Sequence, residues 1–233
     1  MSGEQRRLEI TRVTADLFAV HGFSVYTRRI SEELGTSQAA LYKHFKSKDA
    51  IIEEVFRVRY LQEKPSDFHL HLDTLPGSLL DRLTVAYVSF FSGITETSLK
   101  LFHRASYDGL GLAKRDSLHL NERRVWPVLE HLRAEVGLAT LSDLPASRDE
   151  RELALMLHST IVLLGIRKFV YHIDFADNEP QGIRQYVSVW RAGAMAQYHA
   201  RQGPQYHRFA KRWRRLSASR GGLTLRWRFV SHV

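Results

Sequence analysis

The chain has 233 residues, 44% of them hydrophobic and 25% charged, which is the composition of a folded globular protein with room for one or two domains. It has no cysteine, which excludes disulfides and thiolate-bound zinc or iron–sulfur clusters and agrees with a reducing cytosol. The net charge of +9 arises from Arg201 onward, where nine basic residues and no acidic one leave positions 1–200 electrically balanced. The charge alone therefore does not predict that the body of the chain binds nucleic acid.

The spacing of apolar residues predicts that the N-terminal quarter folds into four helices. The first is expected to end at Gly22 and the second at Gly35, since glycine commonly follows a helix C-terminus. Ser37 and Ser47 are expected to cap the third and the fourth, the fourth running over residues 48–61. The predicted buried faces comprise Ile10, Val13, Leu17 and Phe18, then Ile30 and Leu34, then Leu41 and Phe45, then Ile51, Ile52, Val55 and Phe56.

The rest of the chain is also predicted to be helical, so the expected fold class is all-α. Residues 63–77 are a boundary segment because they contain two prolines and a glycine that break helices. Helices are expected beyond it, the third with a kink or a start near Pro127 and the fourth preceded by a capping box of Ser147 and Glu150. Their ranges are 79–97, 99–107, 114–136, 153–171 and 183–201.

Residues 26–45 combine a short helix, a turn and a second short helix, which is the spacing of a helix-turn-helix. Leu41 and Phe45 are expected to anchor the second of these helices, leaving four residues on its free face. Of these, Gln38 is placed to bond an adenine edge, Tyr42 and Lys43 to contact phosphates, and Ala39 to allow a close approach to the bases. By pattern alone, a small helical bundle without DNA explains these residues equally well.

A more specific pattern extends over residues 10–55. Its densest block is Leu41-Tyr42-x-His44-Phe45-x-Ser47-Lys48-Asp49, and it also includes Ile10, Ala15, Leu17, Phe18, Gly22, Phe23, Ile30, Leu34, Gly35, Ser37 and Ile51. This pattern resembles the DNA-binding domain of TetR-type (TetR/AcrR) transcriptional regulators. The sequence departs from the family in a link from Gly22 to Ile30 that is one residue shorter, in Ser31 for the usual alanine, and in Thr36 for the usual apolar residue.

The resemblance implies a homodimer that binds double-stranded operator DNA and is regulated by a small-molecule effector. We therefore expect a helix-turn-helix DNA-binding domain over 4–62, the boundary segment 63–77, an effector-binding and dimerisation domain over 78–202, and a basic tail over 203–233. By the resemblance, Thr27 and Arg28 approach phosphates, and Lys48 meets one at the start of the fourth helix. The expected DNA-binding residues are Thr27, Arg28, Thr36, Ser37, Gln38, Ala39, Tyr42, Lys43, His44 and Lys48.

The run 153–166 is apolar on nearly every side, which indicates a helix buried all round. Together with the helix over 183–201, it is expected to form the dimer interface, because a two-fold operator needs two recognition helices about 34 Å apart. A purely intramolecular core is the alternative. The expected interface residues are Leu153, Leu157, Ile161, Leu164, Tyr186, Trp190 and Tyr198.

Aromatic residues are frequent in the middle helices, which indicates either an ordinary core or an effector cavity with a few polar groups in an aromatic wall. The candidate pocket residues are Tyr87, Phe90, Phe91, Phe102, His103, Tyr107, Trp126 and His131. The fourth helix, 48–61, is expected to be the only segment that joins this aromatic cluster to the recognition helices. A tilt of that helix would then change the spacing of the two recognition helices in a dimer.

Other chemistry has little support in the sequence. Residues 69–73 alternate potential metal ligands without further ligands nearby, so no metal site or cofactor is expected. No nucleophile elbow, phosphate-binding loop or zinc-protease motif is found, so no enzyme activity is expected. The segment MSGEQRRLEI lacks the apolar core of a signal peptide, and no run reaches the roughly 18 apolar residues of a membrane span. We expect a cytoplasmic protein with no membrane partner.

Three functions remain at this point. The favoured one is a ligand-responsive transcriptional regulator, a repressor released from its operator by a small molecule. The second is a small-molecule-binding protein or enzyme with a vestigial helix-turn-helix. The third is an architectural protein that binds nucleic acid through the tail 203–233, for which a disordered, solvated extension is the simpler interpretation.

Overall fold

A computed structural model describes residues 2–58, 68–111 and 120–201. Every regular element within these ranges is helical, which confirms the predicted fold class. In chain order the elements are α1 (Gly3–His21), α2 (Thr27–Glu33), α3 (Gln38–Tyr42), α4 (Lys48–Phe56), α5 (Phe68–Thr74), α6 (Leu79–Ser92), α7 (Glu96–Tyr107), the π-helical turn η2 (Asn121–Val125), α9 (Trp126–Glu135), α10 (Arg148–Phe169) and α11 (Glu179–Arg201). The expected end of the fourth helix, the start of the helix over 114–136 and the tail 203–233 lie outside the described residues. Among the helices of the described ranges, none combines the length and the hydropathy that a membrane span requires.

Several helix starts follow the predicted capping chemistry. The hydroxyls of Ser37 and Ser47 accept hydrogen bonds from the amides of Ala40 and Ala50, which begins α3 and α4. Ser147 and Glu150 form the expected capping box at the start of α10. Pro127, near which a helix start was predicted, lies in the first turn of α9. Backbone N–H groups in a first turn have no acceptor within the helix, so proline costs no hydrogen bond there.

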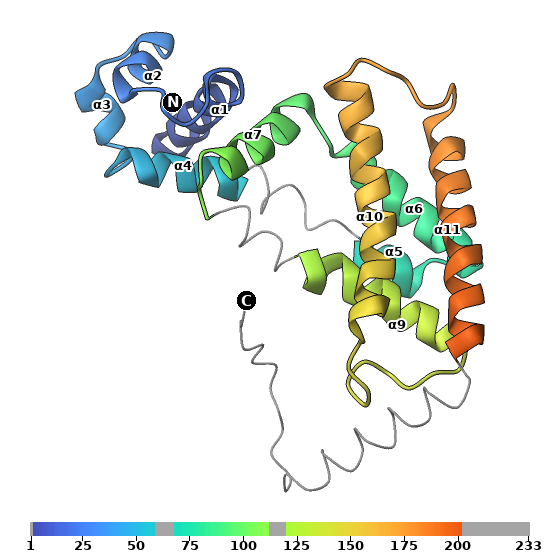
Figure 1. Ribbon diagram of the computed structural model, residues 1–233. Coiled ribbons are helices and arrows are strands. Elements are labelled where there is room, and N and C mark those ends of the chain that lie inside the picture. The colour runs from blue at the N-terminus through green and yellow to red at the C-terminus, as the bar shows by residue number, and fades with distance from the viewer. Residues whose placement is uncertain (1, 59–67, 112–119, 202–233) are drawn as a thin grey trace, which may run out of the picture.

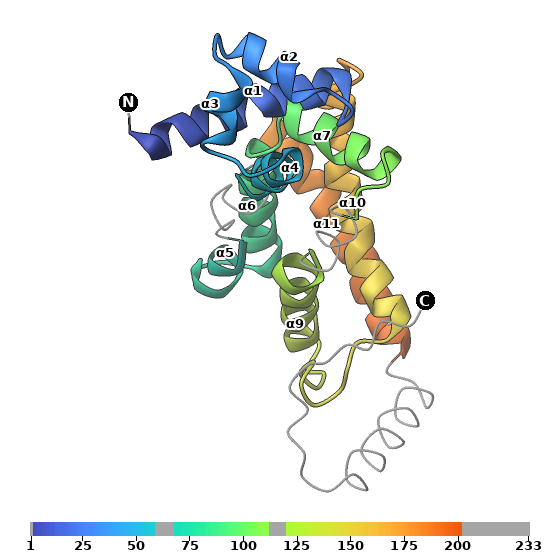
Figure 2. The same cartoon turned by 90° about the vertical axis from the view of Figure 1, so that its left-hand side faces the viewer.

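Two hydrophobic clusters organise the helices, which are labelled in Figure 1. One cluster, which we call the N-terminal core, joins α1 to α4 and includes Leu101 and Ala105 of α7. The other, the C-terminal core, joins α5, α6, α9, α10 and α11. In both Figure 1 and Figure 2, α10 and α11 lie side by side as the two longest helices of the C-terminal part. Leu99 of α7 belongs to the C-terminal core, so one helix contributes to both clusters.

The segment 63–77, expected as a boundary, contains the helix α5. Phe68 and Leu72 of this helix are fully buried in the C-terminal core. The ring of Phe68 lies 5.0 Å from that of Tyr87 in an edge-on arrangement, so α5 packs directly against α6. The part of this segment that follows residue 67 therefore belongs to the packed body.

Helix α7 connects the C-terminal core to the N-terminal core. Arg104 of α7 donates from Nε to the carbonyl of Ala19 at 2.9 Å and from Nη2 to that of Val20 at 2.6 Å. Asp108 accepts from the amide of Phe23 at 3.0 Å. These bonds satisfy groups at the end of α1 that the helix itself leaves unpaired. The expectation that residues 48–61 form the only link is therefore wrong.

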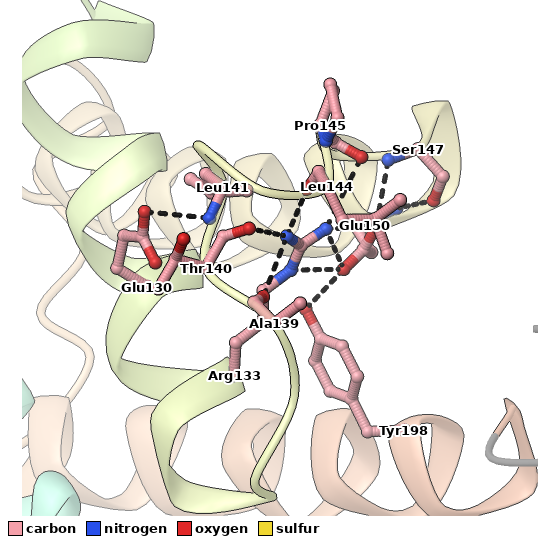
Figure 3. A network of polar contacts seen from close by, with 10 residues as sticks. All are labelled: Glu130, Arg133, Ala139, Thr140, Leu141, Leu144, Pro145, Ser147, Glu150 and Tyr198. Carbon is pink, nitrogen blue, oxygen red and sulfur yellow. Dashed lines mark hydrogen bonds and ion pairs between the residues drawn. The ribbon is translucent and has the colours of Figure 1, made fainter. Parts of the chain in front are cut away.

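A buried ion pair holds the far end of the C-terminal part (Figure 3). Arg133 of α9 is 1% exposed and donates from Nε and Nη2 to the two oxygens of Glu150 at 2.9 and 3.0 Å. The same guanidinium donates to backbone carbonyls of the loop between α9 and α10, and Glu150 also accepts from the hydroxyl of Tyr198 at 3.2 Å. The network ties α9, α10, α11 and the connecting loop together.

Replacing Arg133 with methionine should destabilise the chain by about 3–5 kcal/mol, because the carboxylate of Glu150 would remain buried without its charge partner. Chemical denaturation followed by circular dichroism measures this loss. Arg184→Met is the matched control, because Arg184 pairs with Asp81 at an exposed site. A loss in Arg133→Met no larger than in the control would contradict this assignment.

Candidate nucleic-acid interface

Helix α3 is a single short helix of five residues whose position is set by its neighbours. The turn before it contains Gly35 at φ 59°, a backbone conformation that favours glycine, and the amide of Thr36 donates to the carbonyl of Ser31 at 2.9 Å. Leu41 is fully buried in the N-terminal core and Phe45 is 2% exposed. A helix this short is unstable alone in water, so its contact with α2 and the burial of Leu41 and Phe45 in the N-terminal core hold it in place.

The residues predicted to contact DNA lie on α2 and α3, in the turns next to α3 and at the start of α4, and none of them is buried. Tyr42 is 44% exposed, and Gln38, Ala39 and Lys43 are also exposed. Thr27, Thr36, His44 and Lys48 are half-buried, and Arg28 and Ser37 are exposed. Two hydrogen bonds connect three of these side chains: Gln38 donates from Nε2 to Oγ1 of Thr27 at 3.1 Å, and that oxygen lies 3.2 Å from the hydroxyl of Tyr42.

Arg7 of α1 fastens the end of α3, and sequence reasoning did not find it. Its Nη1 donates to the carbonyl of His44, and its guanidinium carbon lies 4.3 Å from the ring centre of Phe45. Its Nη2 lies 3.6 Å from Oε1 of Glu54. The pKa of Glu54 is lowered, chiefly by its hydrogen bond to Arg57 and further by Arg7. No local sequence pattern predicts this contact, because it joins residues 37 positions apart.

Lys48 is the first residue of α4, directly after the cap formed by Ser47, and it is half-buried. Partial burial lowers the pKa of its ammonium group, and the neighbouring carboxylate of Asp49 raises it again in part. A cation that is half-buried in this way is already partly stripped of water. Its contact with a phosphate would therefore cost less desolvation than that of a fully hydrated lysine.

The eight residues expected in the effector pocket do not form one group. Tyr87 and Phe91 are buried in the C-terminal core, and Phe90 and Trp126 pack against it. Phe102 and His103 of α7 are half-buried, and Tyr107 is 85% exposed. His131 is bonded through Nε2 to Oδ1 of Asp73 at 2.9 Å, which joins α9 to α5. Phe102, His103 and Tyr107 therefore lie on α7, the helix that contacts the N-terminal core, whereas Tyr87 and Phe90 lie on α6.

His158 of α10 joins the aromatic group that the structure does bring together. Its ring lies 5.0 Å from Phe90 and 6.4 Å from Tyr87, and the guanidinium carbon of Arg124 lies 4.3 Å from the ring centre of Phe90. The Nδ1 atom of His158 is buried without a hydrogen-bond partner in the part of the chain described. Burial, followed by the charge of Arg124, lowers the pKa of this imidazole to about 3, so it is neutral at pH 7.

The residues expected at the dimer interface lie mostly inside one chain. Leu153, Leu157, Ile161, Leu164 and Tyr198 are at most 5% exposed and belong to the C-terminal core, while Tyr186 and Trp190 are half-buried. The indole of Trp190 donates to the carbonyl of Leu153 at 2.8 Å, which fixes α11 against α10. The large apolar side chains that these two helices do expose are Met156 at 59%, Leu163 at 51% and Val189 at 70%.

Comparison with known proteins gives a sequence match in the N-terminal part of the chain and fold matches over most of it. Residues 10–55 match the sequence model of the tetR family of bacterial regulatory proteins. The HTH-type transcriptional repressor KstR2 of Mycolicibacterium smegmatis is 36% identical over 90 residues, a match that covers 38% of this chain and 43% of that protein. The aligned region thus spans less than half of this relative.

Two solved structures share the fold over most of the chain. A putative transcriptional regulator from Pseudomonas aeruginosa superposes with a TM-score of 0.64 at 21% identity, covering 86% of this chain and 95% of the other. The ketosteroid transcriptional regulator KstR2 of Mycobacterium tuberculosis superposes with a TM-score of 0.55 at 19% identity, covering 81% and 94%. At these identities the likeness concerns the fold.

The neutral state of His158 predicts a pH dependence of stability. The unfolded chain binds a proton near pH 6.5, whereas the folded chain binds it only near pH 3, so stability is present above pH 6.5 and falls below it. His158→Leu should remove this dependence, and the wild type should lose up to about 1.4 kcal/mol per pH unit relative to the variant. Denaturation curves of both proteins between pH 7 and 4 measure the difference. Parallel curves would show that the imidazole titrates normally in the folded chain.

Proposed function

Because residues 10–55 match the sequence model of the tetR family of bacterial regulatory proteins, we propose that the chain is a transcriptional regulator of this family that binds a specific double-stranded operator. The observation that carries the proposal is the outer face of α3. Gln38, Tyr42 and Lys43 project from a helix whose opposite side is fixed in the N-terminal core. A rigidly held short helix with polar and basic side chains on its free face fits the major groove of DNA.

The proposed contacts are of two chemical kinds: those to phosphates, which position the protein on the duplex, and those to bases, which read the sequence. Tyr42, Lys43 and Lys48 are proposed to bind phosphates, which fixes the protein on the duplex without reading its sequence. Gln38 carries both a donor and an acceptor in one amide, the combination that pairs with an adenine edge. Ala39 is exposed and small, so it lets the helix backbone come close to the bases.

We further propose that the chain is a repressor that a small molecule releases from DNA. Support comes from the relative in Mycolicibacterium smegmatis, which is a transcriptional repressor, and from the aromatic group around Tyr87, Phe90 and His158. A buried polar atom without a partner in an aromatic wall is what a ligand with one hydrogen-bonding group would satisfy. Helix α7 is proposed to carry the response, because it contributes to both cores.

Release requires that the effector bind the DNA-incompetent arrangement more tightly than the DNA-bound one. Movement of α7 would reach α1 through Arg104, whose guanidinium holds the carbonyls of Ala19 and Val20. The coupling is reciprocal, so operator DNA should weaken effector binding by the same factor by which effector weakens operator binding.

Selection from a pool of randomised duplexes with the full chain tests the proposed function. A sequence-specific regulator acting as a dimer should enrich two copies of one half-site in inverted orientation, with centres about one helical turn or a multiple of it apart. Enrichment of no sequence over the starting pool would overturn the proposal. Retention that depends on the tail 203–233 and shows no preference would favour the architectural alternative.

Lys48→Ala should weaken binding to the enriched duplex and to an unrelated duplex alike. Loss of one phosphate contact should flatten the plot of log K against log salt by about one unit. Fluorescence anisotropy at several salt concentrations measures the slope. Lys100→Ala on α7 is the matched control and should leave the slope unchanged. An unchanged slope in Lys48→Ala would remove this residue from the DNA contacts.

We propose that the homodimer forms through the outer faces of α10 and α11. The support is the exposure of Met156 and Leu163 on α10 and of Val189 on the neighbouring α11, since exposed large apolar side chains can mark an interface. Gly193 is also exposed on α11 and leaves space around its Cα for a close approach of a second helix. This assignment replaces the expected interface residues that lie in the core of one chain.

Leu163→Glu and Val189→Arg should each convert the dimer into a folded monomer, because each would bury a charge without a partner at the interface. Sedimentation should give about twice the chain mass of 26.9 kDa for the wild type and the single chain mass for the variants. Val85→Glu, which changes an exposed valine of α6, is the control and should remain dimeric. Dimeric variants would place the interface elsewhere.

A further inference from the structure

Three polar side chains of α2 and α3 are connected by hydrogen bonds in the absence of DNA. Thr27 is the centre of this group: its Oγ1 accepts from Nε2 of Gln38 at 3.1 Å and lies 3.2 Å from the hydroxyl of Tyr42. The group spans two helices, because Thr27 begins α2 while the other two residues are the first and last of α3. We call these three residues the hydroxyl–amide triad.

Thr27 is the member of the triad whose position is best fixed. Its side chain is half-buried, whereas Gln38 and Tyr42 are exposed. Its carbonyl accepts from the hydroxyl of Ser31 at 2.9 Å, and Ser31 is 3% exposed beside the fully buried Ile30. A threonine also has a stiff first side-chain torsion. The hydroxyl is therefore held by the helix that carries it.

Gln38, by contrast, has a long and flexible side chain that an exposed position alone would leave free to rotate. Ordering a glutamine costs side-chain entropy, and a contact made before binding removes part of that cost from the binding step. One of the two amide hydrogens of Gln38 is used by Thr27. The other hydrogen and the carbonyl oxygen remain, which is the pair that bonds an adenine edge.

We propose that Thr27 is a positioning residue that sets the base preference of the recognition helix by holding Gln38, and not primarily a phosphate contact. The inference rests on the proposed function, since it concerns how the same surface reads DNA. A threonine hydroxyl has one donor and two acceptor sites, so Thr27 bonds Gln38 and Tyr42 at the same time. Its loss should therefore relax the choice of sequence more than it weakens binding in general.

The test compares Thr27→Val, which keeps the shape and removes the hydroxyl, with Thr27→Ser, which keeps the hydroxyl. Binding is measured to the duplex enriched by the wild type from a random pool and to a shuffled duplex of the same composition. Thr27→Val should reduce the ratio of the two affinities by about 2- to 12-fold, the effect of losing one hydrogen bond, while the salt slope stays unchanged. Thr27→Ser should keep most of the wild-type ratio.

A double variant separates positioning from direct contact. If Thr27 acts through Gln38, adding Thr27→Val to Gln38→Ala should cost no further discrimination, so the two changes should be strongly non-additive. Additive losses, or equal weakening on both duplexes with a salt slope flatter by about one unit, would make Thr27 an independent phosphate contact and overturn the proposal. Thermal unfolding of each variant verifies that the domain remains folded.

A measurement on the free protein keeps this inference distinct from the proposed function. The side-chain amide of Gln38 should show a lower nuclear magnetic resonance order parameter in Thr27→Val than in the wild type and in Thr27→Ser. An amide that is equally mobile in all three proteins would overturn the positioning role even if DNA binding is specific. If the wild type enriches no duplex while the order parameter falls as expected, the triad exists but the proposed function fails.

Discussion

The burial of Leu41 and Phe45 in the N-terminal core is the contact on which the proposed recognition surface depends. Helix α3 has only five residues, and a helix of this length has no stability of its own in water. Its outer face can present Gln38 and Lys43 in a fixed arrangement only because its inner face is locked into a core. Arg7 adds a second attachment at the end of the helix by binding the carbonyl of His44 and lying over the ring of Phe45.

The same core extends into the C-terminal part of the chain through α7. Leu101 and Ala105 are fully buried among the residues that support α3, and Leu99 is buried in the other core. Because packed cores shift between discrete arrangements and do not deform continuously, a displacement of α7 would be felt at α1. This arrangement is the route by which we propose that the aromatic group at His158 acts on the proposed DNA-binding surface.

Local patterns predicted the helices of this protein well, and long-range contacts explain where prediction stopped. Apolar spacing identified Leu41 and Phe45 as buried, and hydroxyl residues identified the starts of α3 and α10. The same spacing could not predict which helix packs against a buried face. Leu153 and Leu157 are buried as expected, but in the core of their own chain, because an apolar helix looks alike whether it packs within one chain or between two.

The polar contacts escaped prediction for a related reason. Arg104 meets the end of α1 across 85 positions, and Arg133 meets Glu150 across a loop whose course the sequence does not specify. Proline and glycine in residues 63–77 indicated a boundary, yet Phe68 and Leu72 pack into the core, since breakers mark helix ends and not the limits of a folded unit.

The most direct test of the central claim is the affinity of Leu41→Ala for the duplex enriched by the wild type. The substitution removes buried contacts worth about 2–5 kcal/mol, which exceeds what a five-residue helix can lose and keep its place. We predict loss of specific binding while hydrogen exchange shows unchanged protection of the amides of α10. Wild-type affinity in this variant would contradict the account, because the recognition surface would then not depend on the core beneath it.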